Sequence, residues 1–282
     1  MSGLIYFLSI VNSAANTVCG VIFAPIAMVP GWLSITIISA ILGIPLFIIF
    51  KYTSNQRALT RTIDDIKANL LAVRLYRDNI AVTMKSEARL MLCSVKLFVY
   101  SLIPVLIMSI PLSLILAQMG LWYQARPLQL GDAPVVVNLK LNNASEHWPD
   151  VTLDACPGAR IVAGPMRIAS RKEICWTIQP VQAGTHLLKF QVGDQQIVKQ
   201  LVIGTGFMRV SAKRPGTDAA DVIMHPLEQP LSAAGPVASI SIAYPARHSF
   251  MCGTDWWLVW FCIISMISAL LTSPFIKGRL SA

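Results

Sequence analysis

The chain has 282 residues, of which 55% are hydrophobic and only 13% are charged, and its mean hydropathy is +0.60. Soluble proteins carry about twice that share of charge, so the composition excludes an ordinary soluble globular protein and indicates a membrane protein. The formal net charge of +9 does not indicate nucleic-acid binding, because the Lys and Arg residues form no single dense patch interleaved with aromatic residues.

The first fifty residues contain no charged side chain. Within them, residues 3–23 predict an uncharged amphipathic helix, with small polar side chains on one side and large apolar ones on the other. The polar side comprises Ser9, Asn12, Ser13 and Asn16, and the apolar side comprises Leu4, Phe7, Leu8 and Val11. This segment, residues 1–30, is interfacial, re-entrant before Pro25 and Pro30, or a fourth span. We favour the first two alternatives, since a polar stripe is costly in lipid without protein partners.

Three apolar runs are long enough to cross a hydrocarbon core about 30 Å thick, at about 1.5 Å per helical residue. The first span is 31–50, and the second, 97–118, contains Pro104 and Pro111, which we expect to kink it. The third span, 256–276, begins with tryptophans that are placed as an interfacial anchor. These are Trp256, Trp257 and Trp260.

The orientation follows from the loop between the first two spans, which is rich in Lys and Arg, because short basic loops stay in the cytoplasm. Lys277 and Arg279 in the tail, 277–282, indicate the same side. A chain with three spans then has its N-terminus outside and its C-terminus in the cytoplasm. The long segment 119–255 is therefore expected to be extracytoplasmic.

Residues 51–96 predict an antiparallel coiled-coil hairpin. Apolar residues recur at alternating four- and three-residue steps in the first arm, and they continue at near-helical spacing through the second arm into the second span. Asp78 and Asn79 indicate the turn, and arms of about 23 residues reach roughly 35 Å from the membrane. The predicted seam comprises Leu59, Ile63, Ile66, Leu70 and Val73 in the first arm, and the apolar residues at near-helical spacing in the second arm are Ile80, Met84, Ala88, Met91 and Val95.

The hairpin also combines basic and methionine side chains, which suit a cytoplasmic arm that contacts hydrophobic clients. The alternative is a hairpin that only stabilises itself and whose outer charges are a solvated face. The candidate arm residues are Arg57, Arg61, Lys67, Arg74, Arg77, Met84, Lys85, Arg89 and Met91.

The segment 119–255 changes to the period of two that is typical of half-buried strands. About seven short strands with no helix-length pattern among them predict an all-β, sandwich-like domain. Gly193 and Asp194 indicate a hairpin turn, and Lys199 is an exception to the alternation. The alternating residues are Val135, Val137, Leu139, Leu141, Ile174, Trp176, Ile178, Leu188, Phe190, Val192, Ile197, Leu201, Ile203, Ile240, Ile242 and Tyr244.

The cysteines and histidines indicate no metal or redox centre. The six cysteines include no CxxC pair, and the four histidines have no carboxylate or second histidine at ligand or triad spacing. We therefore expect no cofactor and no enzymatic activity. Cys156 and Cys175 both lie in the extracytoplasmic segment and are the candidate disulfide, which we expect to form if strand register brings their Cβ atoms together.

Polar residues gather in the cytoplasmic halves of the second and third spans, which contain no charge. If the two faces meet, they form a hydrophilic groove that contacts clients. The alternative, which the bare pattern favours, is that the hydroxyls only hold helices together. The candidate groove residues are Lys96, Tyr100 and Ser101 at the start of the second span and Ser265, Ser268 and Thr272 on the third.

This order of parts resembles the YidC/Oxa superfamily of membrane protein insertases, in the three-span branch that includes the insertase subunit of the endoplasmic reticulum membrane protein complex. The resemblance covers the spans and the hairpin, with FKYTSNQ at 50–56, IKANLL at 66–71 and LYRD at 75–78. It implies a shallow cytosol-facing groove that moves short hydrophilic segments across the membrane, and a coiled coil that receives ribosomes or clients.

Two features depart from that family. Insertases of the YidC kind carry an intramembrane arginine, whereas the nearest cations here are Lys51 and Lys96 at the membrane edge. The eukaryotic three-span members lack a domain like 119–255, which resembles the extracytoplasmic part of uncharacterised bacterial members. The resemblance therefore implies a bacterial inner membrane as the location.

We expect from these observations an insertase or intramembrane chaperone that assists the insertion or assembly of membrane proteins. Its expected partners are the lipid bilayer, membrane-protein clients, and ribosomes or nascent chains, with no specific nucleic-acid sequence among them. The alternative is a membrane-anchored structural or recognition subunit whose β domain binds a partner in the envelope.

Overall fold

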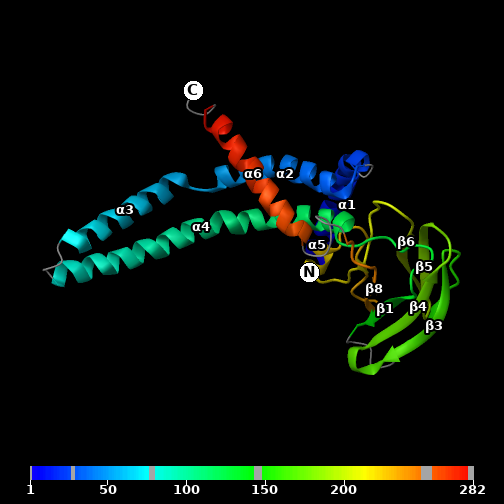
Figure 1. The fold of residues 1–282 in the computed structure, drawn as a ribbon. Helices are drawn as coiled ribbons and strands as arrows, with labels where there is room; N and C mark the ends of the chain where they lie inside the picture. The colour runs from blue at the N-terminus through cyan, green and yellow to red at the C-terminus, as the bar shows by residue number, and fades with distance from the viewer. Residues whose placement is uncertain (1, 27–28, 76–79, 143–147, 249–255, 279–282) are drawn as a thin grey trace. The chain divides into compact units, whose positions relative to one another are not determined.

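The computed structural model describes residues 2–26, 29–75, 80–142, 148–248 and 256–278. Within these residues the chain forms helices α1 to α6 and strands β1 to β8 (Figure 1). It divides into two compact units, which comprise residues 1–38 with 113–263 and residues 39–112 with 264–282. The prediction of a protein with both long apolar helices and a β domain is confirmed.

Four of the described helices are long and apolar enough to cross a membrane. They are α1 (Ser2–Ile26), α2 (Gly31–Thr53), α4 (Ile80–Tyr123) and α6 (Trp256–Gly278). The three predicted spans lie within α2, α4 and α6, whereas α1 is the segment for which the sequence left three alternatives. These helices support a membrane protein, and the role of α1 depends on its contacts.

Helix α4 is unbroken through Pro104 and Pro111. Its 44 residues correspond to about 66 Å, roughly twice the thickness of a hydrocarbon core. One continuous helix therefore carries both the second arm of the hairpin and the second span. The first arm is α3 (Gln56–Leu75), which runs antiparallel to the first half of α4 (Figure 1).

The buried side of the hairpin does not coincide with the apolar spacing of its second arm. The five apolar residues at near-helical spacing in this arm of α4 are all exposed, whereas Ser86 and Cys93 are buried. On α3, Thr62 is buried and four of the five predicted seam residues are half-buried. The apolar spacing of the second arm therefore identifies a helix, but not the face of that helix that packing covers.

The strands form two antiparallel sheets. The first has the order β3 (Ala159–Ile168), β4 (Glu173–Pro180), β1 (Val135–Leu141), β8 (Val237–Ile242) and β7 (Lys213–Arg214). The second has the order β2 (Val151–Leu153), β5 (Gly184–Val192) and β6 (Gln195–Ile203). The short helix α5 (Ala219–Met224) follows β7.

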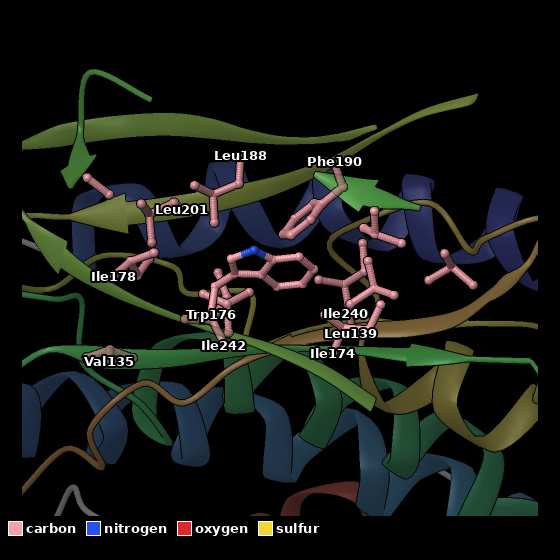
Figure 2. Packing of buried hydrophobic residues seen from close by; sticks show 14 of the residues in the cluster. Val135, Leu139, Ile174, Trp176, Ile178, Leu188, Phe190, Leu201, Ile240 and Ile242 are labelled. Carbon is pink, nitrogen blue, oxygen red and sulfur yellow. The ribbon is translucent and has the colours of Figure 1, made fainter. Parts of the chain in front are cut away.

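Side chains from both sheets share one core, in which Trp176 of β4 is nearly fully buried. Its indole lies edge-on to the ring of Phe190 on β5, with the ring centroids 5.4 Å apart. Figure 2 shows this indole among Leu188, Leu139 and the other labelled core residues. The alternation read from the sequence therefore identifies the inward faces of these strands correctly.

The predicted turn at Gly193 joins β5 and β6, which pair in register from Gly184 with Ile203 to Val192 with Gln195. Gly193 has φ +56°, a left-handed conformation that glycine adopts without strain. This turn therefore sets the register of the second sheet.

Candidate functional site

The candidate arm carries an apolar surface that the described residues of the chain leave uncovered. Eight large apolar side chains of α3 and of the part of α4 before Lys96 are each more than half exposed, from 56% for Val95 to 76% for Ile80. They are Leu70, Leu71, Leu75, Ile80, Met84, Met91, Leu92 and Val95. The sequence analysis identified only Met84 and Met91 as client contacts. Of the other six, it placed Leu70, Ile80 and Val95 among the apolar positions of the hairpin, and it did not single out Leu71, Leu75 or Leu92.

The basic residues of the arm share this exposed surface. Arg57, Arg61, Lys67, Arg74, Lys85 and Arg89 are all exposed, and Arg77 lies outside the described residues. Lys67 lies 3.5 Å from Asp64, and because both side chains are more than 60% exposed this ion pair contributes little to stability. The arm therefore presents cations and large apolar groups together.

On α6, the candidate groove hydroxyls bind backbone oxygens. Ser268 donates to the carbonyl of Ala40 on α2 at 2.8 Å, and Thr272 donates to the carbonyl of Ser268 at 2.9 Å. The backbone of Ser265 lies against Gly43 of α2, where an added Cβ would be only 2.6 Å from the Ser265 oxygen. The contacts of Ser265 and Ser268 thus connect α6 to α2, which is the helix-holding role given as the alternative.

On α4, Lys96, Tyr100 and Ser101 are exposed. The Ser101 hydroxyl donates to the carbonyl of Leu97 in its own helix at 2.8 Å. Each satisfied hydroxyl can lie in a membrane at little cost, because its donor no longer requires water. The structure places these residues on the open surface of α4, and a groove that includes the α6 residues stays a prediction.

A second polar cluster, which the sequence did not reveal, joins α1 to the β domain. The Asn12 amide donates to the carbonyl of Val222 in α5, and the Asn16 amide donates to the carbonyl of Pro226, both at 2.7 Å. Gln118 of α4 donates to the Asn16 side-chain oxygen at 2.9 Å. The helical spacing of the two asparagines was visible in the sequence, but partners 210 residues away were not.

Aromatic rings pack together where the ends of α1 and α4 meet. Trp122 stacks on Phe23 of α1 and on Phe207, with centroid distances of 5.8 and 5.7 Å, and Tyr123 packs against Phe207 at 5.1 Å. Of the three tryptophans predicted as an interfacial anchor, Trp256 is 69% exposed, Trp257 is buried and Trp260 donates to Thr36 at 3.0 Å. The latter two therefore take part in contacts within the protein.

Lys199, the exception in β6, is completely buried and donates to the carbonyl of Ser211, to the Ser211 hydroxyl and to Glu228, at 2.7, 3.0 and 2.5 Å. Burial lowers the pKa of Lys199, and the neighbouring Glu228 carboxylate opposes this shift. A lysine beside a serine can act as a general base only when the lysine is neutral and the serine is accessible. Here the lysine is paired with a carboxylate and Ser211 is buried, so the arrangement is that of a structural ion pair.

Cys156 and Cys175 are both free thiols in the structure. The backbone of Cys156 forms an isolated antiparallel β-bridge with Ala159, and Ala159 lies opposite Pro180 of β4. Cys175 of β4 lies opposite Met166 instead. Five residues of β4 therefore separate the two positions, about 16 Å along the strand. The structure does not form the expected disulfide, and the strand register is the reason.

Comparisons of this chain with protein-family models, with curated proteins and with solved structures find no match. The likeness to the YidC/Oxa superfamily therefore depends on the order of the parts and on the short stretches quoted above.

Proposed function

We propose that this protein is a membrane protein insertase or intramembrane chaperone of the YidC/Oxa kind, acting without covalent chemistry. The observation that carries the proposal is the exposed apolar surface of its basic arm. Monomeric proteins seldom leave large apolar patches in contact with water unless the patches bind something.

The charged side chains of the arm keep this apolar surface in water and out of the hydrocarbon core of the membrane. Basic and acidic side chains are spread along α3 and the first half of α4, so the arm is too costly to insert into hydrocarbon. Its leucines and methionines consequently face water unless an apolar partner covers them. Methionine adapts to partners of different shape, and the surrounding cations attract acidic client segments or ribosomes.

In this proposal, α4 connects the arm that binds a client to the span along which the client enters the membrane. The arm and the second span belong to one continuous helix, so an apolar segment held on the arm can pass along the exposed face that begins at Lys96 and Tyr100. Polar groups at that point, with the groove residues of α6, would lower the cost of bringing the polar parts of a client into lipid.

The remaining topological expectations belong to the same proposal. We place the arm in the cytoplasm of a bacterium, the spans in its inner membrane, and the N-terminus outside. The β domain would be a sandwich on the extracytoplasmic side. The basic loop supports the orientation, and the core shared by the two sheets supports the sandwich.

A photo-crosslinking residue at Leu92 tests the proposal in native membranes during synthesis of membrane proteins. We expect adducts with apolar segments of nascent membrane proteins. The exchange Leu71→Gln with Met91→Gln should lower their yield several-fold, because about 1 kcal/mol of apolar contact per side chain corresponds to about fivefold in affinity.

Thr60→Gln provides the control, since Thr60 is exposed on the same arm and already polar. This variant should crosslink like the original protein. Equal adduct yields from all variants would contradict the proposal and favour the alternative in which the β domain binds an envelope partner.

A further inference from the structure

Helix α1 has two opposite faces with different surroundings. Asn12, Asn16 and Phe23 recur at helical spacing, and each of them contacts the rest of its unit, through hydrogen bonds or ring stacking. Phe7, Ile10, Ala14, Val18 and Val21 recur at the same spacing on the other face and are exposed, to 61% for Phe7 and 73% for Val21. Within the part of the chain that the structure describes, the amide face of α1 is covered and its apolar face is open.

We infer that α1 lies in the plane of the membrane, in the leaflet on the side of the β domain, with this open face in contact with the acyl chains of that leaflet. The occupant must be apolar, since the first fifty residues supply no charged side chain. Continuity with the membrane helices favours lipid over a separate protein, because α1 lies directly before α2 and contacts the end of α4.

The contacts of α1 argue against a fourth span. Asn12 and Asn16 lie near its midpoint, so in a spanning helix they would lie near the centre of the bilayer. Their partners would follow them to that depth, including α5 with the ion pair between Asp221 and Lys213.

Arg209 would also follow, because it donates to the Asn16 carbonyl at 3.4 Å and lies over the Trp122 ring. Three charged side chains at the bilayer centre are unfavourable.

The direction of α1 agrees with an in-plane helix. Figure 1 shows α1 running across the first turns of α2 and the last turns of α4, which belong to the same compact unit. Helices that are parallel in space stay parallel in any view, so α1 is not parallel to these turns of α2 and α4.

Spin labels on α1 test the inference in the full chain reconstituted in vesicles. Labels at Phe7→Cys and Val21→Cys, with the native cysteines replaced by serine, are 14 residues apart on one face. Collisions with oxygen and with a water-soluble nickel chelate report depth. We expect both labels in the acyl region of one leaflet at equal depth. Reference labels at Leu106→Cys in α4 and Val181→Cys in the β domain, both exposed, should report hydrocarbon and water respectively.

Each other outcome overturns the inference. A depth difference of about 21 Å would show a spanning helix. Full access to the nickel chelate would show a helix in water, and low access to both reagents would show a protein partner on this face.

The double variant Asn12→Leu with Asn16→Leu tests the attachment itself. It removes the hydrogen bonds to the Val222 and Pro226 carbonyls and makes both faces apolar. We expect the Phe7 label to move deeper than the Val21 label in this variant. Unchanged, equal depths would mean that these bonds do not hold α1 in the plane.

Discussion

At the scale of single residues, Lys199 shows how a side chain can contradict a strand pattern without disrupting the strand. It lies on the same side of β6 as Leu201 and Ile203, which are core residues. Its amine is satisfied there by Ser211 and Glu228 from the segment that follows β6. A charge can be buried in this way only when a partner charge and hydrogen bonds replace water.

Removing the carboxylate should therefore cost more than removing the pair. We expect Glu228→Gln to lower the free energy of unfolding of the β domain by about 3 kcal/mol, because it leaves the Lys199 charge buried without its partner. Native-state hydrogen exchange of the β5 and β6 amides measures this loss. The double variant Lys199→Met with Glu228→Gln should recover most of it. An equal loss in both variants would show that the pair itself, and not the unpaired charge, sets the stability.

At the scale of elements, α2 and α6 approach each other through small residues. Gly43 lies against the backbone of Ser265, and Ser268 donates to the Ala40 carbonyl one turn away. In lipid, close packing of this kind holds helices together where the hydrophobic effect does not. The candidate groove residues of α6 thus contribute to packing whether or not they also contact clients.

We expect Gly43→Ala to separate these helices, since its Cβ would lie 2.6 and 2.9 Å from backbone atoms of Ser265 that cannot rotate away. Overpacking of this kind costs about 1–3 kcal/mol, which unfolding of the detergent-solubilised protein should reveal. Gly3→Ala is the matched control, because Gly3 is also helical and nothing lies within 4 Å of its added Cβ. If both variants were equally stable, the close contact at Gly43 would not be a determinant of the packing.

At the scale of the whole molecule, the positive loop and the β domain should lie on opposite sides of the membrane. In inverted vesicles, with the cytoplasmic side outward, an impermeant maleimide should label Lys67→Cys on α3 completely and leave Asp194→Cys at the β5–β6 turn unlabelled, in a background without other cysteines. Intact spheroplasts should give the opposite pattern. We expect this pattern because short loops rich in Lys and Arg remain on the cytoplasmic side of the membrane. Labelling of both positions from one side would contradict the topology.

The sequence by itself determined the features that depend on composition and period. Long uncharged runs such as 31–50 predict apolar helices in any fold, because every backbone polar group in lipid must be satisfied within the helix. Alternation such as Val135, Val137, Leu139 and Leu141 identified an inward strand face correctly, since side chains of a strand point to opposite sides in turn. The exposure of the basic side chains on the arm was also predictable, because a charged side chain without a partner stays in contact with water.

Only the tertiary structure decided which distant residues meet. The carbonyls that bind Asn12 and Asn16, the carboxylate that pairs with Lys199 and the register that separates Cys156 from Cys175 all come from other parts of the chain. The hairpin shows the same limit, because spacing identifies a helical face but not the depth to which a neighbouring helix covers it. The sequence pattern of a single helix or strand shows its period. Which of its side chains are buried, and which residues they bind, depends on the segments that pack against it in the folded protein.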